Sequence, residues 1–111
     1  MKNYIELKEN TSDVTHLKVE VYYDLGGYNY FAYTEKKRGY YVSVTPVKKW
    51  TVDGVPMESF TAFTGFKMLV KEVARKSKKA ESEAIQAAEK IQNKMIACVC
   101  KEQNLEVKEN E

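Results

Sequence analysis

The apolar residues of this chain change their spacing at Gly65, and that change constrains the fold more than any other feature of the sequence. Between Val14 and Tyr23 apolar and polar residues alternate, which is typical of a strand with one buried face. After Gly65 the apolar residues recur at helical spacing, at i, i+3, i+4 and i+7 from Phe66 onward. The sequence therefore predicts an α+β fold, with an antiparallel sheet first and helical structure after it.

The sheet is expected to be a four-stranded antiparallel meander over residues 14–63, because turn signals separate four strand-like runs. The strongest signal is Asp53-Gly54, which is typical of a two-residue hairpin turn. Such a turn sets apolar residues opposite each other and a lysine opposite a glutamate, which supports the register. The pairs that it implies are Val52 with Val55, Trp50 with Met57, Lys49 with Glu58 and Val44 with Phe63.

Helical structure is expected over residues 65–104, with Thr64 as its N-cap. One unbroken helix over this range would be about 60 Å long, too long for so small a sheet, so a bend or break is expected near Ser77. Either one bent helix or two consecutive helices would pack on one sheet face. A chain of 111 residues suits one core, so we expect a single domain, 1–111, with flexible ends at 1–12 and 105–111.

Seven of the eight tyrosines lie between residues 22 and 41, and their placement depends on the first turn of the meander. A two-residue turn at 26–27 would place Tyr28 and Tyr30 beside the valines of the first strand. A three-residue turn at 25–27 would place Phe31 and Tyr33 there instead. We prefer the three-residue turn because it buries Phe31 and leaves hydroxyl-bearing rings accessible to water or to a partner.

The face away from those valines would then carry an aromatic cluster. One interpretation is a platform on which a protein hot spot docks or on which bases stack, since tyrosine offers a large contact area with a polar tip. The alternative is ordinary cross-strand pairing of aromatic residues, which needs no partner. The candidate partner-binding residues of this face are Tyr22, Tyr28, Tyr30 and Tyr41.

The net charge of +2 conceals a basic middle third of the chain. Residues 36–79 carry eleven Lys and Arg against three acidic residues, or +8, whereas residues 1–35 and 80–111 carry −3 each. Such asymmetry indicates a polyanionic partner or an acidic protein surface. On the expected helix the basic residues form a ridge that contacts phosphates or, alternatively, is only a solvated face; these residues are Lys67, Lys71, Arg75, Lys78 and Lys79.

No catalytic or metal-binding set can be assembled from the sequence, so we expect no enzyme, no cofactor and no metal site. His16 is the single histidine, and the glycines form neither a phosphate-binding loop nor a dinucleotide fingerprint. Cys98 and Cys100 are two residues apart, which suits neither a disulfide nor a zinc site, so free thiols are expected. No apolar run approaches the roughly 20 residues that span a bilayer, so we expect a cytoplasmic protein without a membrane partner.

The helix beyond residue 80 has a narrow apolar stripe with 4-3-4-3 spacing, as in helices that pack side by side. One small sheet is not expected to cover this stripe, so a homodimer through the C-terminal helix is predicted. The residues of the stripe are Ala84, Ala88, Ile91, Met95 and Cys98.

Three blocks, "VYYDLGGYNYFAY", "RGYYVSVTPV" and "ESFTAFTGFKMLVKEVARKSKKAE", cover roughly residues 18–81 and resemble small accessory proteins of bacterial mobile elements, namely plasmids, integrated elements and phages. No functional residue is carried over from this group. The resemblance implies an accessory protein that acts by binding a protein or nucleoprotein target. Its most concrete form is an anti-CRISPR-like inhibitor of a host-defence nuclease, and the alternative is a nucleic-acid-binding regulator of the element.

Overall fold

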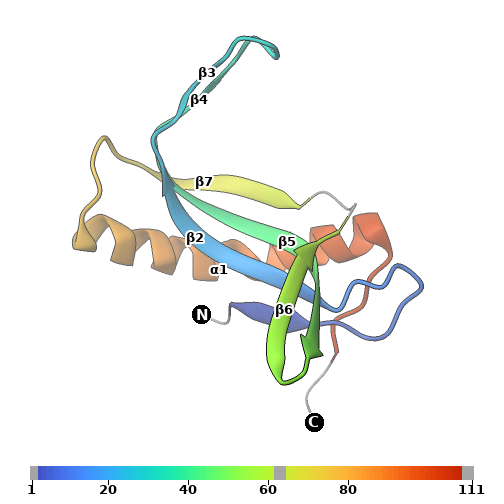
Figure 1. Cartoon of the computed structure of the whole chain (residues 1–111). Helices are drawn as coiled ribbons and strands as arrows, with labels where there is room; N and C mark the ends of the chain where they lie inside the picture. The colour runs from blue at the N-terminus through green and yellow to red at the C-terminus, as the bar shows by residue number, and fades with distance from the viewer. Residues whose placement is uncertain (1–2, 62–64, 109–111) are drawn as a thin grey trace.

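The computed structural model describes residues 3–61 and 65–108. Within these residues the chain forms seven strands and one long helix (Figure 1). In chain order they are β1 (Tyr4–Glu6), β2 (His16–Asp24), β3 (Gly27–Asn29), β4 (Thr34–Lys36), β5 (Gly39–Val52), β6 (Val55–Phe60), β7 (Phe66–Glu72) and α1 (Lys78–Gln103). The predicted α+β class with an antiparallel sheet and a C-terminal helix is confirmed.

The long strand β5 organises the main sheet. One of its edges pairs with β2, which in turn pairs with β1. The other edge pairs with β7 along residues 39–44 and with β6 along residues 47–52. In the described parts of the chain the main sheet therefore has five strands, and β3 and β4 form a separate pair, so the expected four-stranded sheet is too small.

The hairpin predicted at Asp53-Gly54 is confirmed. Val52 pairs with Val55, and the register continues as expected to Trp50 with Met57 and Lys49 with Glu58. Both turn residues have positive φ, 49° at Asp53 and 80° at Gly54, as a tight hairpin turn requires. Phe63, the expected partner of Val44, lies outside the described residues, and Val44 pairs with Phe66 instead.

The helix expected from residue 65 is wrong over its first part, because Phe66–Glu72 forms the strand β7. The first half of β5 leaves an edge that β6 does not reach, and β7 completes it. A β-bulge shifts the register between Tyr40 and Tyr41, because Tyr41 pairs with Leu69 and Tyr40 with Lys71, which leaves Val70 as the extra residue. Phe66 and Val70 pack against the core whereas Leu69 lines the outer-face hollow, so the helical spacing of these residues does not correspond to one buried face. Pairing across the sheet therefore decides the structure of this segment over its local periodicity.

The helix α1 begins where a bend or break was expected. The Ser77 side chain accepts a hydrogen bond from the Ala80 amide at 3.0 Å, so Ser77 is the N-cap. The helix is followed by Asn104 as its C-cap. Asn104 has a left-handed backbone, and its amide N–H donates a hydrogen bond to the Cys100 carbonyl. Thr64, the expected N-cap, lies outside the described residues. Neither a bent helix nor two consecutive helices is therefore needed.

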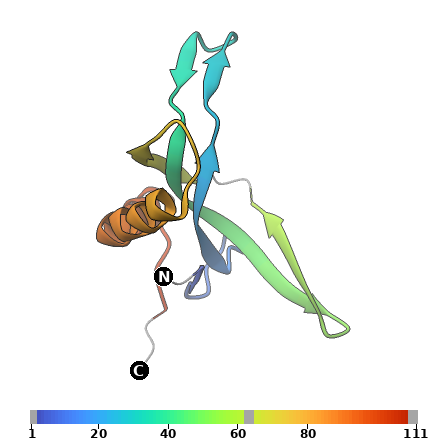
Figure 2. The same cartoon turned by 90° about the vertical axis from the view of Figure 1, so that its left-hand side faces the viewer.

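The core lies between α1 and one face of the sheet, as Figure 2 shows. Its buried members include Leu17, Val19, Val42 and Val44 of the sheet and Ala88, Met95, Ile96 and Val99 of the helix. Parts of the two segments expected to be flexible, 1–12 and 105–111, also join this core, whereas residues 1–2 and 109–111 lie outside the described residues. Leu7 and Leu105 are buried, and Leu7 bridges Val107 across the two segments, so residues 3–8 and 105–108 hold each other in place.

Candidate binding surface

A two-stranded ribbon projects from the main sheet (Figures 1 and 2). It begins where β2 ends at Asp24, and it returns to the body at Gly39, the first residue of β5. Within it β3 and β4 pair antiparallel, with Tyr28 opposite Glu35. The ribbon is thus a continuation of the β2–β5 pair beyond the area that α1 covers.

Exposed aromatic side chains occupy the tip of the ribbon. Tyr30, Phe31 and Tyr33 are 78%, 99% and 81% exposed, respectively. The Asn29 side chain fixes the turn, because its Oδ1 accepts hydrogen bonds from the amides of Phe31 and Ala32, both at 3.0 Å. The expected burial of Phe31 is therefore wrong, since the chain turns at 30–33 and no sheet or helix surface faces this ring.

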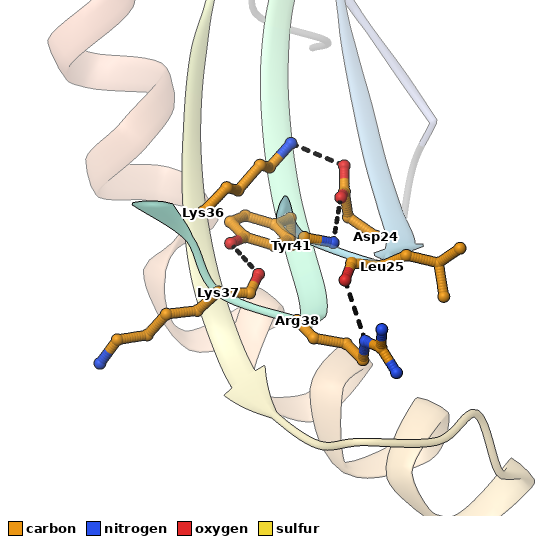
Figure 3. A network of polar contacts seen from close by, with 7 residues as sticks. Asp24, Leu25, Lys36, Lys37, Arg38 and Tyr41 are labelled. Carbon is orange, nitrogen blue, oxygen red and sulfur yellow. Dashed lines mark hydrogen bonds and ion pairs between the residues drawn. The ribbon is translucent and has the colours of Figure 1, made fainter. Parts of the chain in front are cut away.

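A polar network fastens the base of the ribbon to the sheet (Figure 3). The Asp24 carboxylate accepts hydrogen bonds from the Gly26 amide at 2.8 Å and from Lys36 Nζ at 2.6 Å. Arg38 Nε donates to the Leu25 carbonyl at 2.9 Å, so both strands are tied where they leave the body. The hydrogen bond from Lys36, followed by that from Gly26, lowers the pKa of Asp24.

The sheet face away from α1 joins the ribbon at this base. The rings of Tyr22 and Tyr41 stack there, with centroids 5.9 Å apart, and Lys36 Nζ lies 4.9 Å from the centre of the Tyr41 ring. The Tyr41 hydroxyl donates to the Lys37 carbonyl at 2.6 Å (Figure 3). A hollow of about 550 Å³ opens between this face and the ribbon, and Tyr41, Lys36 and Lys67 line it.

Three of the sequence-predicted residues, Tyr22, Tyr41 and Lys67, thus surround the ribbon base. Tyr22 is half-buried, which raises the pKa of its hydroxyl, and Tyr41 is only 7% exposed. Tyr28 and Tyr30 lie on the ribbon itself and contact each other edge to face at 4.9 Å. The four predicted tyrosines therefore form two pairs, one stacked at the ribbon base and one on the ribbon, and not one flat platform.

The predicted basic ridge does not exist, because its residues lie on three different elements. Lys67 is on the outer face of β7, whereas Lys71 turns toward α1 and forms an ion pair with Glu83 at 2.5 Å. Arg75 lies in the connection after β7, and Lys78 and Lys79 begin α1. The strand β7 and its bulge separate side chains that a helix would have aligned.

The sequence reasoning missed two groups of residues. Tyr23 and Tyr40 face α1, and their hydroxyls donate to the carbonyls of Ala74 and Ser77, so they hold the connection between β7 and α1. Phe31 and Tyr33 were assigned to the buried face, although Asn29 within a run of aromatic residues is a turn signal.

The apolar stripe of α1 is largely used within the molecule. Ala84 and Ala88 are fully buried and Met95 nearly so against the sheet, whereas Ile91 is half-buried and Cys98 is exposed. The homodimer therefore stays a prediction, but the uncovered stripe that motivated it is mostly absent. Cys98 and Cys100 are free thiols, and burial raises the pKa of Cys100.

Over 3–61 and 65–108 no three metal-ligating side chains cluster, and no helix there is long and apolar enough to cross a membrane. A hollow of about 630 Å³ near Glu6 and Lys108 is lined mainly by charged and polar residues, and these two pair with each other at 3.2 Å.

No protein-family model matches the sequence, and the comparisons with curated proteins and with solved structures likewise find no match.

Proposed function

We propose that this chain is a non-enzymatic binding protein that docks on a protein or nucleoprotein target through the β3–β4 ribbon. The observation that carries the proposal is the exposure of Tyr30, Phe31 and Tyr33 on a ribbon whose turn and base are fixed by hydrogen bonds. Exposed aromatic rings cost solvation free energy unless a partner covers them. Aromatic side chains on a backbone that is already ordered lose less conformational entropy on binding than those on a mobile loop, so they make effective anchors.

The charges around the ribbon favour an acidic target surface. Lys36 and Lys67 line the hollow at its base, and Lys37 and Arg38 follow β4 in the chain. Lys36 is balanced by Asp24 and Lys37 lies 3.8 Å from the Glu72 carboxylate, which leaves Lys67 and Arg38 to meet a partner's carboxylates or phosphates. Together with the resemblance to accessory proteins of mobile elements, this supports an anti-CRISPR-like inhibitor of a host-defence nuclease in the bacterial cytoplasm.

A second candidate is a nucleic-acid-binding protein of the same kind of element. It is favoured by the combination of exposed rings at the ribbon tip with cations at its base, since bases stack on aromatic side chains and phosphates attract lysine. The two candidates differ in salt dependence. Contacts to phosphates make affinity fall steeply with salt for every sequence, whereas aromatic docking on a protein is much less sensitive.

The test is affinity capture with paired variants. The triple substitution Tyr30→Ser, Phe31→Ser and Tyr33→Ser removes the ribbon anchors, and Val55→Ser with Phe60→Ser removes exposed apolar groups from the β5–β6 hairpin. The captured target is then titrated against all three proteins. We expect the ribbon variant to bind at least about 100-fold more weakly and the hairpin variant to bind within about threefold of the parent.

The proposal fails if the ribbon variant keeps the parent's affinity. If DNA or RNA is the only ligand captured, and removal of Lys37, Arg38 and Lys67 lowers the salt slope, then the nucleic-acid function replaces the inhibitor. Circular dichroism of each variant verifies that the fold is retained.

A further inference from the structure

A groove runs between β7 and α1, on the helix side of the sheet and away from the outer-face hollow at the ribbon base. It has a volume of about 420 Å³. Phe66 and Met68 of β7 form one side, and Ile91 and Cys98 of α1 form the other. Met68 is 49% exposed although its strand neighbour Val42 is fully buried, so apolar surface continues from the core out to the sheet edge. The groove is therefore an opening of the core at one edge.

The strand beside this groove has a free edge. Among the described residues β7 pairs with β5 alone, so its other edge presents main-chain N–H and C=O groups. Figure 1 shows β7 at the upper margin of the sheet, with α1 below it in this view. Seven residues in β conformation extend for about 23 Å, which is enough to pair with an added strand. Such an edge is a template for strand addition.

Charge indicates what such a strand would carry. Lys67 and Lys94 flank the groove, and no carboxylate is among its described lining residues. Glu83 of α1 is already paired with Lys71 of β7. An added strand therefore meets apolar surface on its groove side and positive charge at its flanks.

A second copy of this chain fits this edge poorly. A second copy would bring the same two groove cations, Lys67 and Lys94, and no carboxylate of the described groove lining, so its charge does not complement this edge. Like charges gathered at one interface disfavour association. A foreign segment that carries carboxylates has no such conflict.

We propose that the groove between β7 and α1 binds an extended acidic segment of another protein, which adds to β7 as a strand. Apolar side chains at alternate positions enter the groove and pack on Phe66, Met68 and Ile91. The carboxylates between them point to the outer face, on the side of Lys67, and the positive charge of Lys94 beside the groove adds a longer-range attraction. Lys67 lines both this groove and the outer-face hollow, but no residue of the ribbon lines the groove, so the protein has two docking sites of different character. One presents aromatic anchors to a target, and the other receives a peptide.

The test uses a capped, fluorescent heptapeptide of alternating glutamate and valine, with an alternating lysine and valine peptide as its counterpart. We expect the acidic peptide to bind at least about tenfold more tightly by fluorescence anisotropy. Methylation of the peptide's glutamate nitrogens removes the N–H groups of one strand edge, and methylation of its valine nitrogens removes those of the other. Strand addition predicts that one of the two methylated peptides no longer binds and that the other still binds. If both peptides lose binding, or if both keep it, strand addition is overturned.

The exposed thiol of Cys98 reports where the peptide lies, because it lines the groove. We expect the acidic peptide to slow alkylation of Cys98 at least about fivefold. Lys94→Glu should weaken the acidic peptide about tenfold, whereas Lys90→Glu, one turn away and outside the groove lining, should change its affinity less than twofold. Equal binding of both peptides, unprotected Cys98, or a dimer that Met68→Asp dissociates would each overturn the proposal.

Discussion

The seven tyrosines between residues 22 and 41 divide between two regions with opposite environments. In the body, Tyr22 and Tyr23 of β2 pair with Tyr41 and Tyr40 of β5. The hydroxyls of Tyr23, Tyr40 and Tyr41 all donate to main-chain carbonyls of neighbouring segments. In the ribbon, Tyr28, Tyr30 and Tyr33 are 49%, 78% and 81% exposed.

This difference separates two uses of one residue type. The body tyrosines join the sheet to the segments around it, so they should contribute to the free energy of unfolding. The ribbon tyrosines have little surface covered by the molecule itself, so they should contribute to binding and hardly to stability. Paired substitutions in the two regions test this division directly.

The largest effect is expected for Tyr40→Ala in the body. Tyr40 is 4% exposed, packs on Ala80 and Ala84, and bonds to Ser77, so its loss leaves a cavity and breaks the contact between sheet and helix. We expect the free energy of unfolding in urea to fall by about 3–5 kcal/mol. Phe31→Ala, the matched ribbon variant, should change it by less than about 0.5 kcal/mol. Comparable losses for both variants would show that the ribbon is part of the folded core.

The next largest effect is expected when a glycine of the ribbon base or of the β5–β6 hairpin is replaced by alanine. Gly26 (φ 72°) lies at the ribbon base, where a Cβ would collide with the Lys36 carbonyl, and Gly54 (φ 80°) lies in an open turn with nothing within 4 Å of such a Cβ. Gly54→Ala should cost about 1 kcal/mol from its backbone alone. Gly26→Ala should cost about 2 kcal/mol or more, since collision adds to strain. Urea unfolding measures the free energy of unfolding of both variants. Equal losses would mean that the backbone at the ribbon base shifts to accommodate the new Cβ at no additional cost.

The comparison also shows what the sequence could predict. The Asp53-Gly54 hairpin, a strand at residues 14–23 (β2, His16–Asp24, in the structure) and the helical stripe beyond residue 80 were all predicted, because each has a strong local signal. The ribbon also had a local signal in Asn29, but the tyrosine run was interpreted as a continuous strand. The aromatic rings at the ribbon tip are exposed because the chain turns there and does not continue as a strand of the sheet.

The strand β7 could not be predicted from local pattern. Phe66, Leu69, Val70 and Val73 fit a helix, and only the unpaired first half of β5 makes this segment a strand. That requirement depends on β5 being 14 residues long while β6 pairs with its second half only. The basic ridge was wrong for the same reason, because its alignment presupposed a helix.

A smaller effect is expected when only hydroxyl groups are removed. Tyr23→Phe deletes the hydrogen bond to the Ala74 carbonyl, which is 2.9 Å long, and should lower the free energy of unfolding by about 1 kcal/mol. Tyr28→Phe, its ribbon counterpart, should leave stability unchanged within about 0.3 kcal/mol. Thermal unfolding at matched concentrations resolves the two. A larger loss at Tyr28 than at Tyr23 would reverse the division between body and ribbon.

The smallest effect is a pH dependence confined to the ribbon base. Hydrogen bonds from Lys36 and Gly26 hold the pKa of Asp24 below its ordinary value of 3.8. Because the pKa of Asp24 is depressed in the folded protein, its carboxylate stabilises the ribbon base fully above about pH 4. This stabilisation is lost as the pH falls through the pKa of Asp24 in the folded state. The Gly26 amide, which donates to this carboxylate, should therefore titrate in NMR spectra with a midpoint below 3.8. Lys36→Met should move that midpoint upward, and Asp24→Asn should abolish it. The amide of Val44 in the body should not follow this titration. A midpoint at or above 3.8 in the parent protein would mean that the carboxylate does not fasten the ribbon.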